Sequence, residues 1–429
     1  MDEKRPNHPP DTTLAVRGLA YMALALVAVQ GTAYLFQLMI AVLLSPEEFG
    51  IVRSVDAVLG LFVIIGSAGM PSLAVKCVAA VDDIEGRGRL LRRLLVIAAG
   101  TSLVTSWAAS ALASWLVDVN AVPYLQRLVW IIPAAACART TLNYYQGARE
   151  IRRYSVLTTS VACGMLLPSL VAVSMGGLGG WIWARYGAEA TTLAAALLPL
   201  ANLLRGMGRL APAYSPRRLA RVGSVLSLSL LTRSSLDNLG TLALVAVGAQ
   251  TSQIGYYGIG VLVVLGLLIL PACVGNVALP KLVRNLSNPE TLRATFYQTM
   301  RMSLVLTLPP SILGIAIGPS VVWHFFPTYI ESIPVIQALL VTVSARALTM
   351  VSGTLLVALD QGDVTLVANV LILSVGAVLM LYLTPTFGIL GAAWATVGVE
   401  ATSAFVYGFL AKRELSRCRT STCTAGTAQ

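Results

Sequence analysis

Long apolar stretches separated by short polar connections run along the whole chain. A membrane-crossing helix needs about 20 mostly apolar residues, and twelve segments meet this requirement. They are residues 19–44, 51–76, 94–117, 125–147, 155–175, 180–204, 222–249, 254–278, 302–325, 335–357, 365–384 and 389–411. The sixth segment departs most from the pattern, because GGLGG opens it and Arg185 and Glu189 interrupt it. We therefore predict an all-α polytopic membrane protein of about twelve transmembrane helices.

The composition agrees with a lipid environment. Of the 429 residues, 56% are hydrophobic and 11% are charged, whereas soluble proteins carry about 25% charged residues. The net charge of +11 is not accompanied by an RNA-binding motif or by a basic stretch with interleaved aromatics, so we expect no nucleic-acid partner. The two histidines lie far apart and the six cysteines match no zinc spacing, so we expect no metal and no cofactor.

The basic residues indicate how the chain is oriented. Of the 30 Lys and Arg residues, 23 lie at the N-terminus, in alternate connections or in the C-terminal tail. Because cytoplasmic loops collect Lys and Arg, we place both termini in the cytoplasm. The connection at 358–364 is an exception, since its only charges are Asp360 and Asp363. Every connection is short, so the function must reside between the helices.

The two halves of the chain resemble each other when the sequence is shifted by 205 residues. The segment beginning at Ala41 then meets the segment beginning at Ala246, and Gly50 falls on Gly255. Six spans per half give both halves the same orientation, and parallel repeats are related by an axis along the membrane normal. We expect two six-helix bundles around a central cavity. The predicted divisions are a tail at 1–18, a bundle at 19–204, a linker at 205–221, a bundle at 222–411 and a tail at 412–429.

Three short motifs resemble bacterial flippases of the Wzx type, which move lipid-linked oligosaccharides. They are LLSPEEFGIV after the first span, LDNLGTLALVAVGAQTSQIGYYGIGVLV from Leu236, and GAAWATVGVE from Gly391. The resemblance extends over nearly the whole chain in span count and loop order. It implies membership of the multidrug, oligosaccharidyl-lipid and polysaccharide flippase superfamily, with a fold like that of the multidrug-and-toxin extruders. The implied substrate is an undecaprenyl-diphosphate-linked oligosaccharide, and the implied partners are a polysaccharide polymerase and a chain-length regulator.

Charged residues inside the spans are candidates for the substrate site, because a charge within the bilayer usually faces a cavity or a partner. Arg139 and Arg346 have no acidic residue at helical spacing, so we assign them to the diphosphate, for which the arginine fork is well shaped. Arg233 with Asp237, and Arg185 with Glu189, are spaced for ion pairs within one helix. Each pair could lock helices together or face the cavity.

The remaining assignments are polar groups on the same spans. Asn143 is a candidate sugar contact beside Tyr144 and Tyr145, which could instead form an interfacial aromatic belt. The other assigned residues are Gln30 and Gln37 for substrate binding, Asp237, Glu400 and Glu189 for proton or sodium coupling, and Arg53, Arg127 and Lys76 as residues that reach water at the span ends.

Three classes of function compete. A flippase accounts for the buried arginines and the repeat. An ion-coupled multidrug or metabolite antiporter of the same superfamily would bind organic cations, yet the first span carries no acidic residue. A membrane enzyme would need catalytic groups on a sizeable loop, and no Walker motif, metal cluster or Ser/His/Asp set is present in the sequence. We therefore predict a transporter and not an enzyme.

Overall fold

The computed structural model describes residues 12–81, 83–204 and 216–426, and these residues form helices without a strand. The first half contains α1 (Thr12–Leu43), α2 (Pro46–Ser67), α3 (Met70–Ala79), α4 (Ile84–Ala111), α5 (Ala113–Leu116), α6 (Val122–Leu128), η1 (Val129–Ile131), α7 (Ile132–Gly147), α8 (Ile151–Leu197), η2 (Leu198–Leu200) and α9 (Ala201–Leu204). The second half contains α10 (Pro216–Ala246), α11 (Thr251–Arg284), η4 (Asn285–Ser287), α12 (Pro289–Phe325), η5 (Pro327–Ser332), α13 (Ile333–Ala358) and α14 (Gly362–Gly426).

Twelve membrane crossings can be traced in these helices, which confirms the predicted fold class. In the described residues, seven helices are long and apolar enough to cross a membrane, namely α2, α4, α8, α11, α12, α13 and α14. Two of the seven, α8 and α14, reverse direction in the middle and supply two crossings each. The remaining three crossings are α1, the run from α6 to α7, and α10.

The reversals in α8 and α14 use glycine in the same way. Gly177 has φ 53° and ψ −132°, and Gly388 has φ 58° and ψ −136°, a conformation that is essentially restricted to glycine. Three residues later, a Cβ on Gly180 would overlap the carbonyl of Ala172, and one on Gly391 would overlap the carbonyl of Leu383. Both hairpins thus close without a loop. GGLGG is confirmed as a connection between two spans.

The SPEEFG turn begins α2 with a capping box. The backbone N–H of Glu48 donates to Ser45 Oγ at 3.3 Å, and the backbone N–H of Ser45 donates to Glu48 Oε2 at 3.0 Å. Pro46 occupies the first turn, where its missing N–H costs nothing. The cap fixes the point at which α2 starts. It therefore sets the position of the following Phe49 and Gly50 against the other half of the protein.

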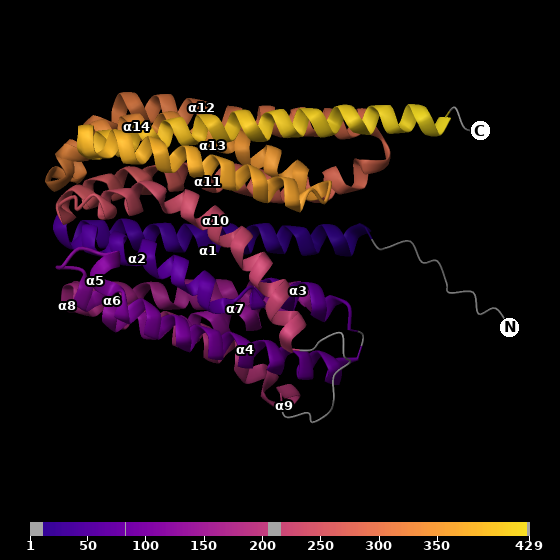
Figure 1. Cartoon of the computed structure of the whole chain (residues 1–429), viewed down its shortest axis with the longest axis horizontal. Helices are drawn as coiled ribbons and strands as arrows, with labels where there is room; N and C mark the ends of the chain where they lie inside the picture. Colours follow the sequence, from indigo (N-terminus) through magenta and orange to yellow (C-terminus); the bar gives the residue numbers. More distant parts are fainter. Residues whose placement is uncertain (1–11, 82, 205–215, 427–429) are drawn as a thin grey trace.

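The core is continuous at one end of the molecule and divided at the other. One large cluster joins residues from both halves, including Ile40 of α1, Val55 of α2 and Leu339 of α13. Toward the chain termini there are two separate clusters, one around Leu94 that joins the first half to Leu219 of α10 and one within the second half around Leu282. We call these the closed end and the open end. Figure 1 shows both termini at the open end, where the two bundles diverge.

The helix α10 leaves the first bundle and enters the second. Near its start, Gly223 meets the backbone of Ala68 and Gly69 so closely that a Cβ on either glycine would overlap its neighbour. Ser227 Oγ also donates to the carbonyl of Ile64 at 2.8 Å. Farther along, α10 packs against α14. The diagonal course of α10 across the gap is visible in Figure 1, so this helix closes one side of the divide.

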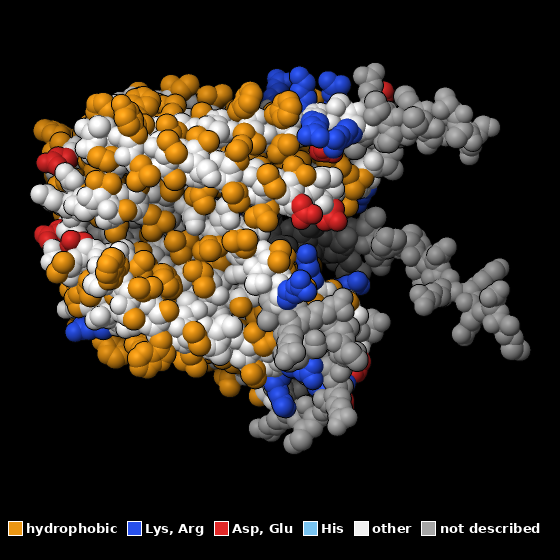
Figure 2. All heavy atoms as spheres, viewed as in Figure 1, with side chains coloured by type: hydrophobic (Ala, Val, Ile, Leu, Met, Phe, Trp, Pro, Cys, Tyr) orange, Lys and Arg blue, Asp and Glu red, His pale blue; other side chains and the backbone are white. Residues whose placement is uncertain are grey.

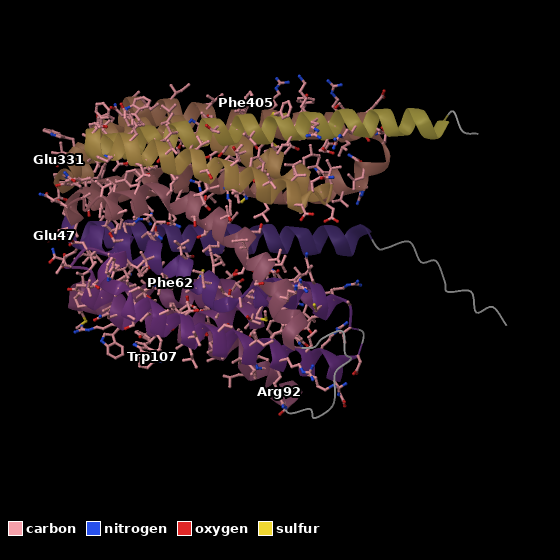
Figure 3. The ribbon with its side chains drawn as sticks, viewed as in Figure 1. Glu47, Phe62, Arg92, Trp107, Glu331 and Phe405 are labelled. Carbon is pink, nitrogen blue, oxygen red and sulfur yellow. The ribbon has the colours of Figure 1, made fainter. Side chains whose placement is uncertain are left out.

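Charge separates the two ends. Figure 2 shows blue side chains gathered at the open end and a mainly orange surface along the bundles. In Figure 3, Glu47 and Glu331 lie at the closed end, and Trp107 and Phe405 lie on the outer faces of the two bundles. Trp107 is 68% exposed and Phe405 is 76% exposed, as expected for side chains that face lipid. The basic residues predicted at 1–17 and 205–218 lie outside the described side chains.

Candidate functional site

A cavity of about 320 Å³ lies at the seam between the two halves. One half contributes α1, with Gln30, Ala33, Tyr34 and Gln37, and the other contributes α10, α11 and α13, with Arg233, Asp237, Leu262, Leu265, Leu268, Ile269, Ala272, Arg346 and Met350. Polar groups on α1, α10 and α13 thus face an apolar wall on α11. We call this the central cavity. Its lining combines anion-binding, hydrogen-bonding and apolar groups.

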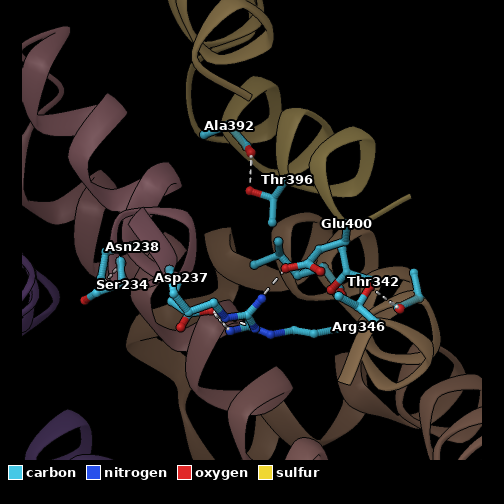
Figure 4. A network of polar contacts seen from close by, with 12 residues as sticks. Ser234, Asp237, Asn238, Thr342, Arg346, Ala392, Thr396 and Glu400 are labelled. Atoms are coloured by element: carbon cyan, nitrogen blue, oxygen red, sulfur yellow. Dashed lines mark hydrogen bonds and ion pairs between the residues drawn. The ribbon is translucent and has the colours of Figure 1, made fainter. Parts of the chain in front are cut away.

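Four charged side chains form a cluster beside the central cavity, and three of them, Asp237, Arg346 and Glu400, are labelled in Figure 4. Arg346 lies between two carboxylates: it donates a hydrogen bond to Asp237, and its Nη1 lies 3.6 Å from Glu400 Oε1. Arg233 Nη2 lies 3.5 Å from the same Asp237 Oδ1. We call these residues the second-half cluster. It holds two cations and two anions, so it carries no net charge while all four are ionised.

Exposure decreases with depth in the second-half cluster. The side chains of Arg233 and Asp237 are each 37% exposed, whereas those of Arg346 and Glu400 are 12% and 11% exposed. Arg233 and Asp237 are therefore the members that a ligand in the central cavity meets first. Arg346 lines the cavity as well but is committed to two carboxylates. An anion that binds Arg346 must compete with Asp237.

A second group of charges lies within the first half. Arg185 Nη2 is 3.4 Å from Asp56 Oδ1, which joins α8 to α2. Arg139 of α7 interacts electrostatically with Glu189 and with Arg185. These four residues, Asp56, Arg139, Arg185 and Glu189, form the first-half cluster. Like its counterpart, it contains two arginines and two carboxylates.

One arginine and one glutamate of each cluster are related by the internal repeat. Glu189 and Glu400 are 211 positions apart, the same offset that separates Gly177 from Gly388 in the hairpins. Arg139 and Arg346 occupy the fourth crossing of each half, 207 positions apart. Each of these arginines interacts electrostatically with the glutamate of the sixth crossing. The two halves thus place the same charge pair between the same two crossings.

Polar side chains lie between the first-half cluster and the second-half cluster. Arg53 Nη1 donates to Gln37 Oε1 at 3.3 Å and is also close enough to interact electrostatically with Asp56 and Tyr257. The hydroxyl of Tyr257 lies 3.0 Å from Thr396 Oγ1, and this tyrosine interacts electrostatically with Arg346 and Glu400. Both Arg53 and Tyr257 are buried. Polar and charged groups therefore extend between the two clusters inside the protein.

The structure brings together most of the residues predicted for substrate binding. Gln30, Gln37, Arg233 and Arg346 all line the central cavity, although they lie on three helices far apart in sequence. Arg139 and Asn143 lie on α7, which contributes no side chain to this lining. Of the residues predicted to carry ions, Asp237 and Glu400 belong to the second-half cluster, and Glu189 belongs to the first-half cluster.

Three sequence interpretations need correction. Arg185 forms its ion pair with Asp56 of α2 and not with Glu189 in its own helix. Arg53 does not reach water at a span end, because its side chain is packed against Gly258 and Phe49 where α2 crosses α11. Tyr144 and Tyr145 form neither a sugar site nor an aromatic belt, since both are buried and Tyr145 donates to the carbonyl of Ala196 at 3.0 Å.

Sequence reasoning also missed three residues of these sites. Asp56 could have been found as a carboxylate within the second apolar segment, at residues 51–76. Tyr34 lines the central cavity and packs its ring on Gly266, and Tyr257 joins the clusters. A tyrosine in a membrane span has many possible roles, so neither position carries a distinguishing signal in the sequence.

Comparison with known proteins finds one matching family and several solved structures with a similar fold. Residues 39–334 match the model of a family described as polysaccharide biosynthesis protein. Among solved structures, the lipid II flippase MurJ in an inward closed conformation is similar with a TM-score of 0.72 at 12% identity, covering 92% of this chain and 89% of that one. No curated protein matches the chain.

Two transporters of the MOP superfamily are similar as well. An inward-facing multidrug resistance MATE family transporter has a TM-score of 0.69 at 16% identity, covering 93% of this chain and 99% of that one. A transporter from Pyrococcus furiosus has a TM-score of 0.66 at 14% identity, covering 94% and 96%. At such low identities the similarity concerns the fold, which is the one predicted from the spans.

Proposed function

Because this chain belongs to the polysaccharide biosynthesis protein family whose model it matches, we propose that it moves undecaprenyl-diphosphate-linked oligosaccharides from the inner to the outer leaflet of the bacterial cytoplasmic membrane. The observation that carries this proposal is the central cavity, which lies between the two bundles and combines two arginines with two glutamines and a tyrosine. A lipid-linked sugar needs all of these: cations for its diphosphate and hydrogen-bonding groups for its sugars.

The arginines are suited to the diphosphate. A guanidinium presents its N–H donors in a planar fork that matches phosphate oxygens, and the resulting charge-assisted hydrogen bonds are among the strong ones in proteins. Arg233 is the more exposed of the two and is held by one carboxylate, Asp237. We assign Arg233 to the first contact with the diphosphate and Arg346 to the contact made as Asp237 is displaced. Gln30 and Gln37 then face the sugars from α1.

The proposed orientation follows from the charges at the two ends. Basic side chains gather at the open end (Figure 2), among them Arg92 of α4, which is labelled there in Figure 3. Arg152 lies in the first turn of α8, and Lys412 lies in the last third of α14. The positive-inside rule assigns such an end to the cytoplasm. Both termini then lie in the cytoplasm, and the cavity admits substrate from the inner leaflet. Export by alternating access requires the closed end to part while the open end closes.

Ion coupling follows from the same cluster. When the diphosphate takes the place of Asp237 on Arg346, Asp237 loses its strongest partner and is left as a less well paired carboxylate inside the membrane. Such a group is stabilised by taking up a proton or a sodium ion. Glu400, which keeps its place behind Arg346, and Glu189 of the first-half cluster are further carriers. For a proton or sodium gradient to drive export, the ion must enter from the outside once the cavity has opened there, and it must be released to the cytoplasm when the empty cavity opens inward again and Arg346 recovers Asp237.

The proposed partners are the enzymes that consume the exported units, a polysaccharide polymerase and its chain-length regulator, because a flipped unit must be joined to a growing chain in the outer leaflet. Surface polysaccharides such as O-antigen, capsule or exopolysaccharide are built in this way. The competing function, antiport of organic cations, needs an acidic group that is free to face the drug. In the described part of the central cavity the carboxylate is Asp237, which is held by two arginines.

Binding of a polyprenyl diphosphate to the purified protein tests this proposal. We expect Arg233→Gln and Arg346→Lys each to weaken binding by roughly 10- to 100-fold, since a hydrogen bond to a charged group contributes about 1.5–3 kcal/mol. Arg346→Lys keeps the positive charge between the two carboxylates, so folding is retained while the fork is lost. The control is Arg127→Gln, an exposed arginine at the closed end. Equal affinity in all four proteins would contradict the proposal.

A further inference from the structure

A second cavity, of about 330 Å³, lies on the membrane-facing side of the second half. Residues from four helices line it, including Leu38 of α1, Leu262 of α11, Gly314 and Gly318 of α12, and Leu340 of α13. Every lining residue is apolar or glycine. We call it the apolar groove. Nothing in its lining can bind a headgroup or an ion, so its chemistry fits a hydrocarbon.

The apolar groove adjoins the central cavity. Leu262 lines both, and α1, α11 and α13 contribute to both. The groove extends from Leu262 toward the closed end, where Val322 and Phe326 complete it at the end of α12. A ligand with an anionic part among the arginines and an adjoining hydrocarbon part could therefore occupy the two sites at once.

We propose that the apolar groove binds the part of the substrate's isoprenoid chain that adjoins the diphosphate. This inference rests on the proposed function and adds to it a subsite with its own specificity. A cavity of about 150 Å³ holds one benzene ring, so the groove holds roughly a dozen carbons, which is two to three isoprene units. The remainder of the chain stays in the bilayer.

The walls of the groove favour the substrate chain over an ordinary membrane lipid. Leu38 belongs to α1, which packs mainly on α8 of the first half, whereas the other walls belong to the second half. The groove therefore changes shape when the two halves move. A chain that is tied to a diphosphate in the central cavity would be gripped and released in step with transport. A phospholipid phosphodiester carries one negative charge, whereas the diphosphate of a lipid-linked sugar carries two, so the arginines hold the diphosphate more strongly.

Gly318 offers a way to fill the groove without disturbing the helix. A Cβ on Gly318 would meet nothing within 4 Å, whereas one on Gly314 would come within 3.0 Å of Leu340 Cδ1. A phenylalanine at 318 thus occupies the groove itself. Gly100 of α4 is a matched control, because it is also a helical glycine with open space around its Cβ, on the exposed surface of the other half.

The test compares two soluble probes, dimethylallyl diphosphate with one isoprene unit and farnesyl diphosphate with three. We expect the native protein to bind farnesyl diphosphate at least tenfold more tightly, because the added carbons leave water. Gly318→Phe is expected to abolish this advantage, so that the two probes bind about equally, while Gly100→Phe retains it. Arg346→Lys is expected to weaken both probes equally.

The outcomes separate the two proposals. The groove proposal would be overturned in two cases: if farnesyl diphosphate binds no more tightly than dimethylallyl diphosphate, or if it does and Gly318→Phe leaves that difference in place. In both cases, binding that depends on Arg346 would leave the proposed function intact. Failure of the native protein to bind either probe would count against the proposed function. Photolabelling of the native protein by a diazirine-bearing farnesyl diphosphate gives an independent reading. Adducts on Leu313 or Ile317 support the groove, and adducts confined to other helices contradict it.

Discussion

Gly50 and Gly255 lie against each other where α2 crosses α11 at the closed end. A Cβ on Gly50 would overlap the carbonyl oxygen of Thr251, and a Cβ on Gly255 would overlap that of Pro46. Thr251 and Pro46 are themselves 205 positions apart, the offset that relates the two glycines. The contact is therefore reciprocal, as expected where two repeats meet at their symmetry axis. It brings the halves together without a side chain between them.

This contact predicts that a larger residue at position 50 forces the closed end apart. We expect Gly50→Val to expose residues that are now buried beside it, such as Val52, which is 3% exposed. Labelling of Val52→Cys by a membrane-impermeant thiol reagent, in a background without other cysteines, measures this. Labelling is expected to be low with Gly50 and high with Gly50→Val. The control is Gly60→Val on the same helix, where a Cβ meets nothing within 4 Å. Low labelling of Val52→Cys with Gly50→Val, or equally strong labelling with Gly60→Val, would contradict this prediction.

The hairpin glycine at 177 predicts a difference between two adjacent positions. Gly177→Ala places a Cβ on a residue with φ 53° and ψ −132°, which costs on the order of 1–3 kcal/mol. Gly176→Ala adds a methyl group to a helical residue with open space and is expected to be neutral or to stabilise by about 0.5–1 kcal/mol. Thermal unfolding of the purified variants gives the comparison. Equal stability of the two variants would show that the reversal does not depend on the glycine conformation.

The arginine between two carboxylates predicts strong coupling in a double-mutant cycle. Arg346→Gln leaves Glu400 without its ion-pair partner and Asp237 with Arg233 alone, and it is expected to destabilise the protein by roughly 3–5 kcal/mol. Adding Glu400→Gln removes one of the stranded charges, so the double variant is expected to recover part of this loss. The midpoint of thermal unfolding for the four proteins in the cycle gives the coupling energy. Purely additive effects would mean that the two side chains do not interact.

The proposed role of Asp237 predicts a separation of binding from coupling. Asp237→Asn removes the exchangeable charge but leaves both arginines, so we expect polyprenyl-diphosphate binding to persist while transport loses its response to a proton or sodium gradient. Transport is compared with and without an imposed gradient in proteoliposomes. Asp363→Asn serves as the control, because Asp363 is exposed at the open end. A normal gradient response in Asp237→Asn would transfer the coupling role to another carboxylate.

The spans, the repeat and the short turns could be predicted from the sequence because they depend on local properties. Apolar length identifies a crossing, and Gly50 and Gly255 could be aligned before their contact was known. The charge partners could not be predicted in the same way. Helical spacing relates residues within one helix, so it identified Arg233 with Asp237. It predicted no carboxylate partner for Arg346, because Asp237 and Glu400 approach this arginine from other helices.

The same reasoning explains the errors at Arg53 and Arg185. Both were judged by their depth or spacing along one span. Arg53 lies where α2 crosses α11, and it donates to Gln37 of α1. Arg185 of α8 forms its ion pair with Asp56 of α2. Tertiary contacts of this kind leave no trace in the order of residues along one helix. The central cavity therefore forms only when the bundles assemble. Most of the residues that the sequence predicted for substrate binding nevertheless line it.

Transport of the lipid-linked sugar itself tests the central claim most directly. The protein is reconstituted in proteoliposomes with an undecaprenyl diphosphate that carries a labelled oligosaccharide, and exposure of the label at the opposite leaflet is followed with time. We predict transport by the native protein, a loss of at least tenfold with Arg346→Lys, and native rates with Arg127→Gln. The contrary result is an absence of flipping for several glycans, together with gradient-driven uptake of an organic cation. It would establish the antiporter and reject the flippase.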